Sequence, residues 1–196
     1  MSMSSFVLIL VPAAVLGWSL VTYNQLVALR NQFQNAFAQI DVQLKRRYDL
    51  IPNLVESAKA YMAHERQTLQ DVIAARNSAE GARQNAADRP EDARAVRQLA
   101  QAEGAVGASL GRMLALAEAY PELKANETMS QLMEELSSTE NRVGFARQAY
   151  NDAVMVYNTA RQSFPGNMLA SRFAFGAAEL LQVVEAHERQ AIRVNF

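Results

Sequence analysis

The sequence predicts an all-α protein, with an N-terminal transmembrane helix followed by an antiparallel up-and-down bundle of long, heptad-patterned helices. The first observation is an apolar N-terminus with no charged side chain before Arg30. The second is that the apolar residues after it recur at steps of four and three, the pattern of packed, coiled-coil-like helices. The third is a composition rich in alanine, glutamine, glutamate, arginine and leucine, which favours helices and is interrupted by only eight glycines and five prolines.

We assign residues 1–22 to a membrane anchor and residues 23–196 to the bundle. The segment from Met3 to Tyr23 is 21 residues long, roughly 31 Å as a helix, close to the hydrocarbon thickness of a bilayer. A cleaved signal peptide is the main alternative, and a buried soluble helix is a second. A signal peptide needs a basic n-region, which this sequence lacks. The lipid-facing candidates are Phe6, Leu8, Leu10, Leu16, Trp18 and Leu20.

The orientation follows from the basic residues that flank the anchor. No lysine or arginine precedes it, whereas Arg30 and then Lys45–Arg47 follow it. Positively charged flanks stay in the cytoplasm. We therefore expect a bacterial inner-membrane protein with a short N-terminus outside and a cytoplasmic bundle.

After the anchor, one apolar seam continues without a change of phase to Val72. This continuity predicts a single helix from the membrane to about Glu80, kinked near Pro52. The alternative is a break there, with Asp49 as the N-cap of a new helix. The polar stretch Gly81–Pro90 is the predicted first linker. The seam consists of Phe33, Phe37, Ile40, Leu44, Tyr48, Ile51, Val55, Ala58, Met62, Leu69 and Val72.

Three further helices are expected, over about Glu91–Tyr120, Asn126–Ser163 and Met168–Arg189. Pro121 ends the first of these, and Asn126 caps the next. The short connections predict antiparallel neighbours. The second helix carries a small-residue face that favours the close approach of another helix, formed by Gly104, Gly107, Ala108 and Gly111.

Several long stretches of the chain resemble the LemA family. They are YNQLVALRNQFQNAFAQIDVQLKRRYDLIPNLVESAKAYMAHE (Tyr23–Glu65), LAEAYPELKAN (Leu116–Asn126), the stretch Thr139–Phe164 and the final RVNF. The resemblance implies an N-terminal transmembrane helix, a small extracellular N-terminus and a helical-bundle domain, with no established biochemical activity. Some family members are associated with internal membrane organelles, including magnetosomes.

Two Tyr-Asn pairs stand one heptad apart and therefore share a helix face: Tyr150-Asn151 and Tyr157-Asn158. We interpret them as core tyrosines whose hydroxyls find partners, with asparagines that set helix register. A peptide-binding groove is the alternative interpretation.

A basic cluster is formed by Lys45, Arg46 and Arg47. It is either a solvated helix face or a contact for anionic lipid or an acidic partner.

Composition and spacing argue against catalysis. The chain has no cysteine, and neither His64 nor His187 has the second histidine at i+4 that a zinc-protease helix requires. We expect no metal, no cofactor and no enzymatic activity. A net charge of −1 argues against nucleic-acid binding.

Two functional hypotheses remain. The first is a non-catalytic scaffold at the bilayer that self-assembles as a homo-oligomer, supported by the long seams and the small-residue face. The second is an adaptor that recruits a client protein, for example to a membrane protease or a secretion system.

Overall fold

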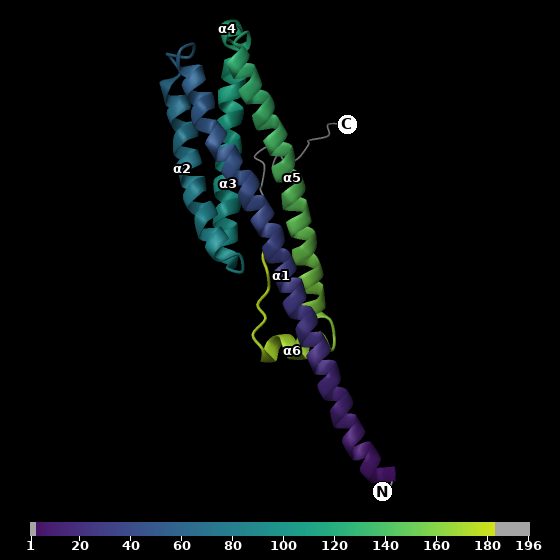
Figure 1. The fold of residues 1–196 in the computed structure, drawn as a ribbon. Helices are drawn as coiled ribbons and strands as arrows, with labels where there is room; N and C mark the ends of the chain where they lie inside the picture. Colours follow the sequence, from purple (N-terminus) through teal and green to yellow (C-terminus); the bar gives the residue numbers. More distant parts are fainter. Residues whose placement is uncertain (1–2, 183–196) are drawn as a thin grey trace, which may run out of the picture.

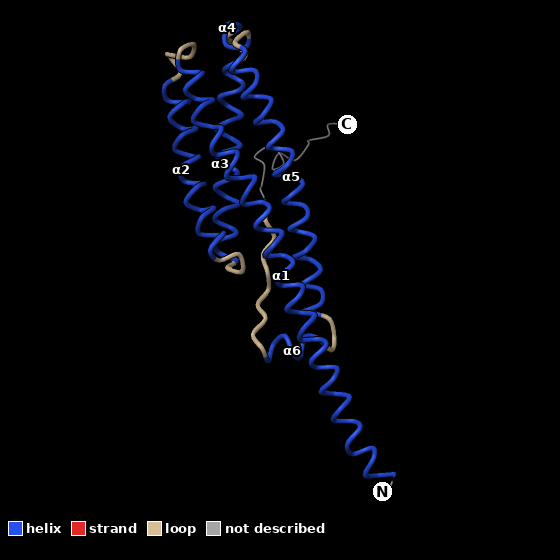
Figure 2. The backbone as a smooth tube through the Cα atoms, viewed as in Figure 1, coloured by secondary structure: helices blue, strands red, loops and turns tan. Residues whose placement is uncertain are grey.

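The computed structural model describes residues 3–182 and confirms the predicted fold class. Within these residues the chain forms six helices and no strand (Figures 1 and 2). Helix α1 runs up from the N-terminus, α2 returns down, α3 runs up again and α5 runs down, so the four long helices form an up-and-down bundle (Figure 1). The most extensive contacts between helices join α1 with α5, α2 with α3, and α1 with α2.

Helix α1 spans Met3–Lys59 as one continuous helix of 57 residues and contains both Pro12 and Pro52. Pro52 therefore does not break the helix. The predicted extension to Glu80 is wrong, because the chain turns after Lys59 and α2 (Arg66–Asp88) runs back beside α1. The turn does not disturb the seam: Met62 within it and Leu69 after it are both buried. A periodic pattern records which residues are buried, but not whether the chain reverses between them.

The prediction of a linker over Gly81–Pro90 is also wrong for most of these residues, because α2 continues to Asp88. Gly81 lies on an exposed part of this helix with open space above it, so it forces no turn. Arg83 lies on the inner side, where it pairs with Asp41 of α1 and with Glu80. These ion pairs hold a polar-looking stretch of sequence in the bundle.

Helix α3 spans Ala93–Ala117, and the Asp92 side chain caps it by accepting a hydrogen bond from the Arg94 N–H. After the short helix α4 (Pro121–Lys124), helix α5 spans Glu127–Gln162. The Asn126 carboxamide oxygen accepts from the Met129 N–H, at 2.9 Å, as its cap. The sequence prediction for these two helices is therefore confirmed, apart from a few residues at the ends of α3.

The predicted last helix, Met168–Arg189, is wrong over its described part. Helix α6 spans only Gly166–Arg172, and residues 174–182 then run back along the bundle in a non-helical conformation (Figures 1 and 2). Ala174 adopts a positive φ of 55°, at the point where the chain leaves α6. The rest of the predicted helix, residues 183–189, and the terminal RVNF lie outside the described residues.

The first part of α1 projects beyond the rest of the bundle (Figure 1). The side chains of Leu10, Leu16, Trp18 and Leu20 are exposed, and Phe6 and Leu8 lie in the same helix. From Leu26 onwards the seam of α1 is buried. By length and composition, α1 is the one helix among the described residues that could cross a membrane.

Candidate functional site

The best-defined site is a row of four side chains on α5, which we call the ladder. It binds residues 174–182, which we call the C-terminal segment. The ladder consists of Tyr150, Asn151, Tyr157 and Asn158. The spacing of seven residues is about two helical turns, so both pairs face the same way. In Figure 1 the segment is the yellow coil that climbs from α6 alongside α1.

The two asparagines bind the main chain of the segment. The Asn158 Nδ2 donates to the Ala178 carbonyl at 2.8 Å, and its Oδ1 accepts from the Ala178 N–H at 3.1 Å. Asn151 repeats the arrangement with Leu181, at 3.3 Å and 2.9 Å. Each carboxamide thus satisfies both polar groups of one residue, as a neighbouring strand would.

The two tyrosines bind carbonyl groups of the same segment. The Tyr157 hydroxyl donates to the Gly176 carbonyl, and the Tyr150 hydroxyl to the Glu179 carbonyl, both at 2.8 Å. Burial, and then the nearby Glu179 carboxylate, raise the pKa of Tyr150 above its ordinary value. The hydroxyl therefore stays protonated and able to donate in alkaline solution, where an ordinary tyrosine ionises.

Apolar contacts support the ladder on both sides. The Tyr157 ring packs against Phe33 of α1 with ring centroids 5.0 Å apart, and Tyr150 packs edge-to-face against Phe37 at 5.5 Å. The segment buries a side chain at every third position, namely at Phe175, Ala178 and Leu181.

An ion pair between Arg97 and Glu179, at 2.7 Å, joins the segment to α3. The segment therefore lies against α3 as well as α5. Its hydrogen bonds to the ladder all use main-chain groups. Such a site favours a backbone conformation more than a particular sequence.

The basic cluster is not a uniform surface. Arg47 is only 5% exposed, and its guanidinium pairs with Glu103 of α3 and Glu140 of α5, both at 2.8 Å. It therefore cannot contact a lipid headgroup, which corrects the prediction for this residue. Arg46 is exposed and pairs with Glu135, and Lys45 is exposed.

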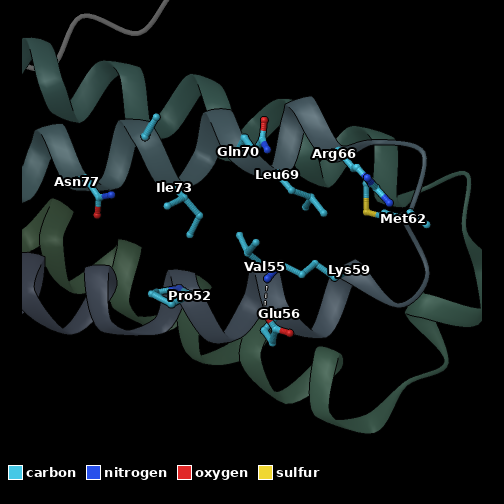
Figure 3. A pocket seen from close by; sticks show the side chains of 12 residues that line it. Pro52, Val55, Glu56, Lys59, Met62, Arg66, Leu69, Gln70, Ile73 and Asn77 are labelled. Carbon is cyan, nitrogen blue, oxygen red and sulfur yellow. Dashed lines mark hydrogen bonds and ion pairs between the residues drawn. The ribbon is translucent and has the colours of Figure 1, made fainter.

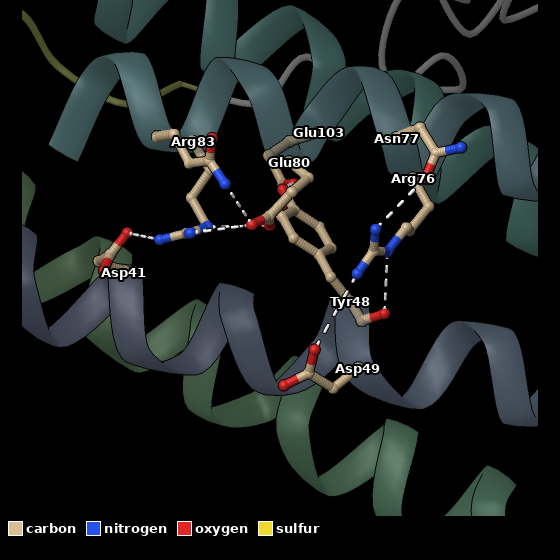
Figure 4. Close-up of polar contacts among 9 residues, drawn as sticks. Asp41, Tyr48, Asp49, Arg76, Asn77, Glu80, Arg83 and Glu103 are labelled. Atoms are coloured by element: carbon tan, nitrogen blue, oxygen red, sulfur yellow. Dashed lines mark hydrogen bonds and ion pairs between the residues drawn. The ribbon is translucent and has the colours of Figure 1, made fainter. Parts of the chain in front are cut away.

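The Glu103 partner of Arg47 also belongs to a polar network around Tyr48, which Figure 4 shows between α1, α2 and α3. The buried Tyr48 hydroxyl donates to Glu103, and Arg76 of α2 donates to the Tyr48 carbonyl at 3.1 Å. Burial first, and the Glu103 carboxylate second, raise the pKa of Tyr48. These bonds join α1, α2 and α3, so we assign the network a structural role.

The family model for LemA proteins matches residues 36–196, which is most of the chain. The chain belongs to the LemA family. This confirms the resemblance noted in the sequence. The match begins inside α1, so the helical bundle carries it and the apolar span precedes it.

The chain is also similar to three magnetosome proteins. MamQ 1 and MamQ 2 of Paramagnetospirillum magneticum are each 26% identical over 184 residues, covering 86% of this chain and 68% of theirs. MamQ of Magnetospirillum gryphiswaldense is 26% identical over 187 residues, covering 88% of this chain and 67% of its own. Neither the family description nor these names states an enzymatic reaction.

The small-residue face of this LemA-family bundle points outward. Gly107, Ala108 and Gly111 on α3 are exposed, and Gly104 is half-buried. A Cβ atom added at Gly107 or Gly111 would have no neighbour within 4 Å. Within residues 3–182, no other helix therefore packs closely against Gly107 or Gly111.

A groove of about 820 Å³ lies at the opposite end of the bundle from the apolar span, between α1 and α2 (Figure 3). Val55, Leu69 and Ile73 point into it, and the Glu56–Lys59 ion pair lies at its edge (Figure 3). Within residues 3–182, no group of three or more histidine, cysteine, aspartate or glutamate residues is placed to hold a metal ion.

Sequence reasoning missed the partner of Arg47, although a signal was present. Glu103 occupies a seam position between Leu99 and Val106, where an apolar residue is expected. A carboxylate at such a position indicates a buried cationic partner. The partner could not be named, because it lies 56 residues away in the sequence.

Proposed function

We propose that this chain is a single-pass inner-membrane protein that acts as a non-catalytic scaffold by self-association, with its N-terminus outside and its bundle in the cytoplasm. The anchoring part is supported by the continuity of α1, which leads without a break from the apolar span into the buried seam. An anchor built this way couples the bundle rigidly to the membrane.

The observation that carries self-association is a set of exposed apolar side chains on α5, which shares its helix face with the exposed Asp152. Phe145 is 74% exposed, and Ala149 and Val156 are exposed on the same side. Their spacing of four and then seven residues keeps them within one helical face. A large exposed aromatic ring with apolar neighbours is typical of a protein–protein contact. The glycine face of α3 offers a second surface, which another helix can approach closely.

Light scattering of the full-length protein in mild detergent, corrected for bound detergent, tests this scaffold. We expect a discrete assembly of several copies, and we expect Phe145→Ser with Val156→Ser to reduce its mass. A monomer over the whole accessible concentration range would exclude self-association as the intrinsic function.

The glycine face has its own matched test. Leucine fits above Gly107 and Gly111 in the isolated chain, because the space there is open. We therefore expect Gly107→Leu with Gly111→Leu to keep the fold and to lower the assembly mass. Gly81→Leu on α2 is the control, since that helical glycine is also exposed with open space above it.

The proposed topology can be read with a single introduced cysteine, because the chain has none. We expect Met133→Cys on α5 to react with a membrane-impermeant maleimide only after the inner membrane is opened. Reaction in intact spheroplasts would show that the bundle lies outside the inner membrane, the opposite of the proposed orientation.

The ladder favours an adaptor as the second candidate function. Because its contacts are to main-chain atoms, an extended peptide from a client could replace the chain's own segment. A fluorescent peptide with the sequence of residues 174–182 provides the probe. If the protein is an adaptor, we expect this peptide to bind the full-length protein. We expect the double variant Asn151→Ala with Asn158→Ala to lose this binding. Absence of binding at high peptide concentration would indicate that the ladder serves only its own segment.

A further inference from the structure

We propose that α6 and the residues on either side of it form a second membrane contact, which lies in the interfacial layer of the bilayer that holds α1. The contact is formed by Phe164, Met168, Arg172 and Phe173. The proposal rests on α1 being the anchor, and adds a surface that sequence reasoning did not assign to the membrane.

The position of α6 is the first observation. It crosses α1 at the end of the bundle from which the apolar span projects (Figure 1). The ring of Tyr23 lies edge-on to Phe173 at 5.1 Å and to Phe175 at 5.6 Å. Gly166 is packed closely against the Ala160 carbonyl and lies beside Thr22. Helix α6 is therefore level with residues 22–23, where the apolar span ends.

The exposure of the apolar side chains is the second observation. Phe164 is 80% exposed, Met168 is 64% exposed and Phe173 is 53% exposed. Ten residues of sequence thus place three large apolar side chains in solvent beside the base of the anchor. Soluble surfaces rarely collect such groups without an interaction partner.

The two faces of α6 differ in the way that an interfacial helix requires. Gly166 and Ala170, four residues apart, are buried against the bundle. Met168 and Arg172, also four residues apart, lie on the opposite face and are exposed. An apolar side chain next to a cationic one suits the boundary between acyl chains and anionic headgroups.

The aromatic residues in the neighbouring part of α1 also indicate the interfacial layer of the bilayer. Trp18 and Tyr23 are both partly exposed on this helix, and these two residue types concentrate at the membrane–water interface. A helix of seven residues is too short to bind a bilayer tightly by itself. Here the anchor holds it at the surface, so a weak contact is sufficient. Two attachment points would fix the tilt and rotation of the bundle above the membrane.

Site-directed fluorescence in vesicles tests this contact on the full-length protein. The vesicles contain phosphatidylcholine and phosphatidylglycerol, and the absence of native cysteine allows one label per variant. An environment-sensitive dye is attached at Met168→Cys, at Leu16→Cys in the span and at Met133→Cys, which lies near the start of α5 at the end of the bundle remote from the span. We expect brominated lipid to quench the dye strongly at positions 16 and 168, with blue-shifted emission, and to leave position 133 unaffected.

The outcomes separate the two proposals. Quenching at position 16 without quenching at position 168 would overturn the interfacial contact and leave the anchor intact. Absence of quenching at both positions would show that α1 itself is not inserted. A blue shift at position 168 that appears only at high protein concentration in detergent, with no lipid quenching, would assign the surface to a second copy and overturn the lipid contact.

As a second readout, Phe164→Ser with Met168→Ser should shift the dye emission at a separate Phe173→Cys label towards that of an aqueous environment. The control is Val42→Ser with Met155→Ser, which removes two exposed apolar side chains from other parts of the bundle. We expect this control to leave the emission at position 173 unchanged. Equal changes from both pairs would contradict a local lipid contact.

Discussion

Replacing both ladder asparagines by alanine, Asn151→Ala with Asn158→Ala, should release the C-terminal segment without unfolding the bundle. The double variant removes four hydrogen bonds, two to Ala178 and two to Leu181. At about 1 kcal/mol net for each hydrogen bond, the docking of the segment weakens by about 4 kcal/mol. The tyrosine contacts and the apolar contacts of the segment remain.

Hydrogen–deuterium exchange followed by mass spectrometry measures this loss directly. A change of about 4 kcal/mol corresponds to roughly a thousand-fold faster exchange of amides protected by local docking. We expect the acceleration in peptides covering residues 174–182, with little change in peptides from α2. The affected amides are those of Ala178 and Leu181, which donate to the asparagines.

The matched control is Asn141→Ala, an exposed asparagine on the same helix. It removes a carboxamide from α5 without touching the segment, so exchange at 174–182 should stay at the wild-type rate. The reasoning is refuted if the ladder variant leaves that exchange unchanged. It is also refuted if all helices accelerate equally, because the asparagines would then support the bundle as a whole.

Three further perturbations test the buried polar groups and the Pro52 position of α1. Arg47→Ala should cost about 3–5 kcal/mol in urea unfolding, because it leaves the buried Glu103 carboxylate without its cationic partner, whereas Arg47→Leu with Glu103→Leu should recover much of that loss. Stability should fall above about pH 10 by roughly 1.4 kcal/mol per pH unit for each of Tyr48 and Tyr150, whose pKa values are raised by burial. There the unfolded chain loses phenolic protons that the folded chain retains, and the slope of melting temperature against pH should be shallower in Tyr150→Phe. Pro52→Ala should raise the melting temperature and increase the free energy of unfolding by up to about 3 kcal/mol, because it restores a helical N–H inside α1. A melting temperature below that of the wild type would show that the packing of the proline ring matters more.

The sequence by itself determined the elements whose signals are local. The apolar span of α1, a candidate membrane anchor, is visible as a charge-free stretch, and α5 is visible as a heptad seam bounded by the Asn126 cap and the break at Phe164–Asn167. The shared face of the two Tyr-Asn pairs also followed from spacing alone. These features depend on residues within a few helical turns of one another, so periodicity and capping chemistry are sufficient.

Only the tertiary structure decided where the chain reverses and which polar groups are buried. The seam passes through the turn after Lys59 without losing phase, so the pattern alone could not reveal it. The sequence groups Arg47 with a basic surface cluster, but Glu103 and Glu140 pair with its guanidinium inside the bundle. The sequence predicts a helix over residues 174–182, but these residues are not helical, and the ladder on α5 binds part of their main-chain N–H and C=O groups. In each case the deciding partner lies far away in the sequence, and the free energy of burial and pairing outweighs the local preference.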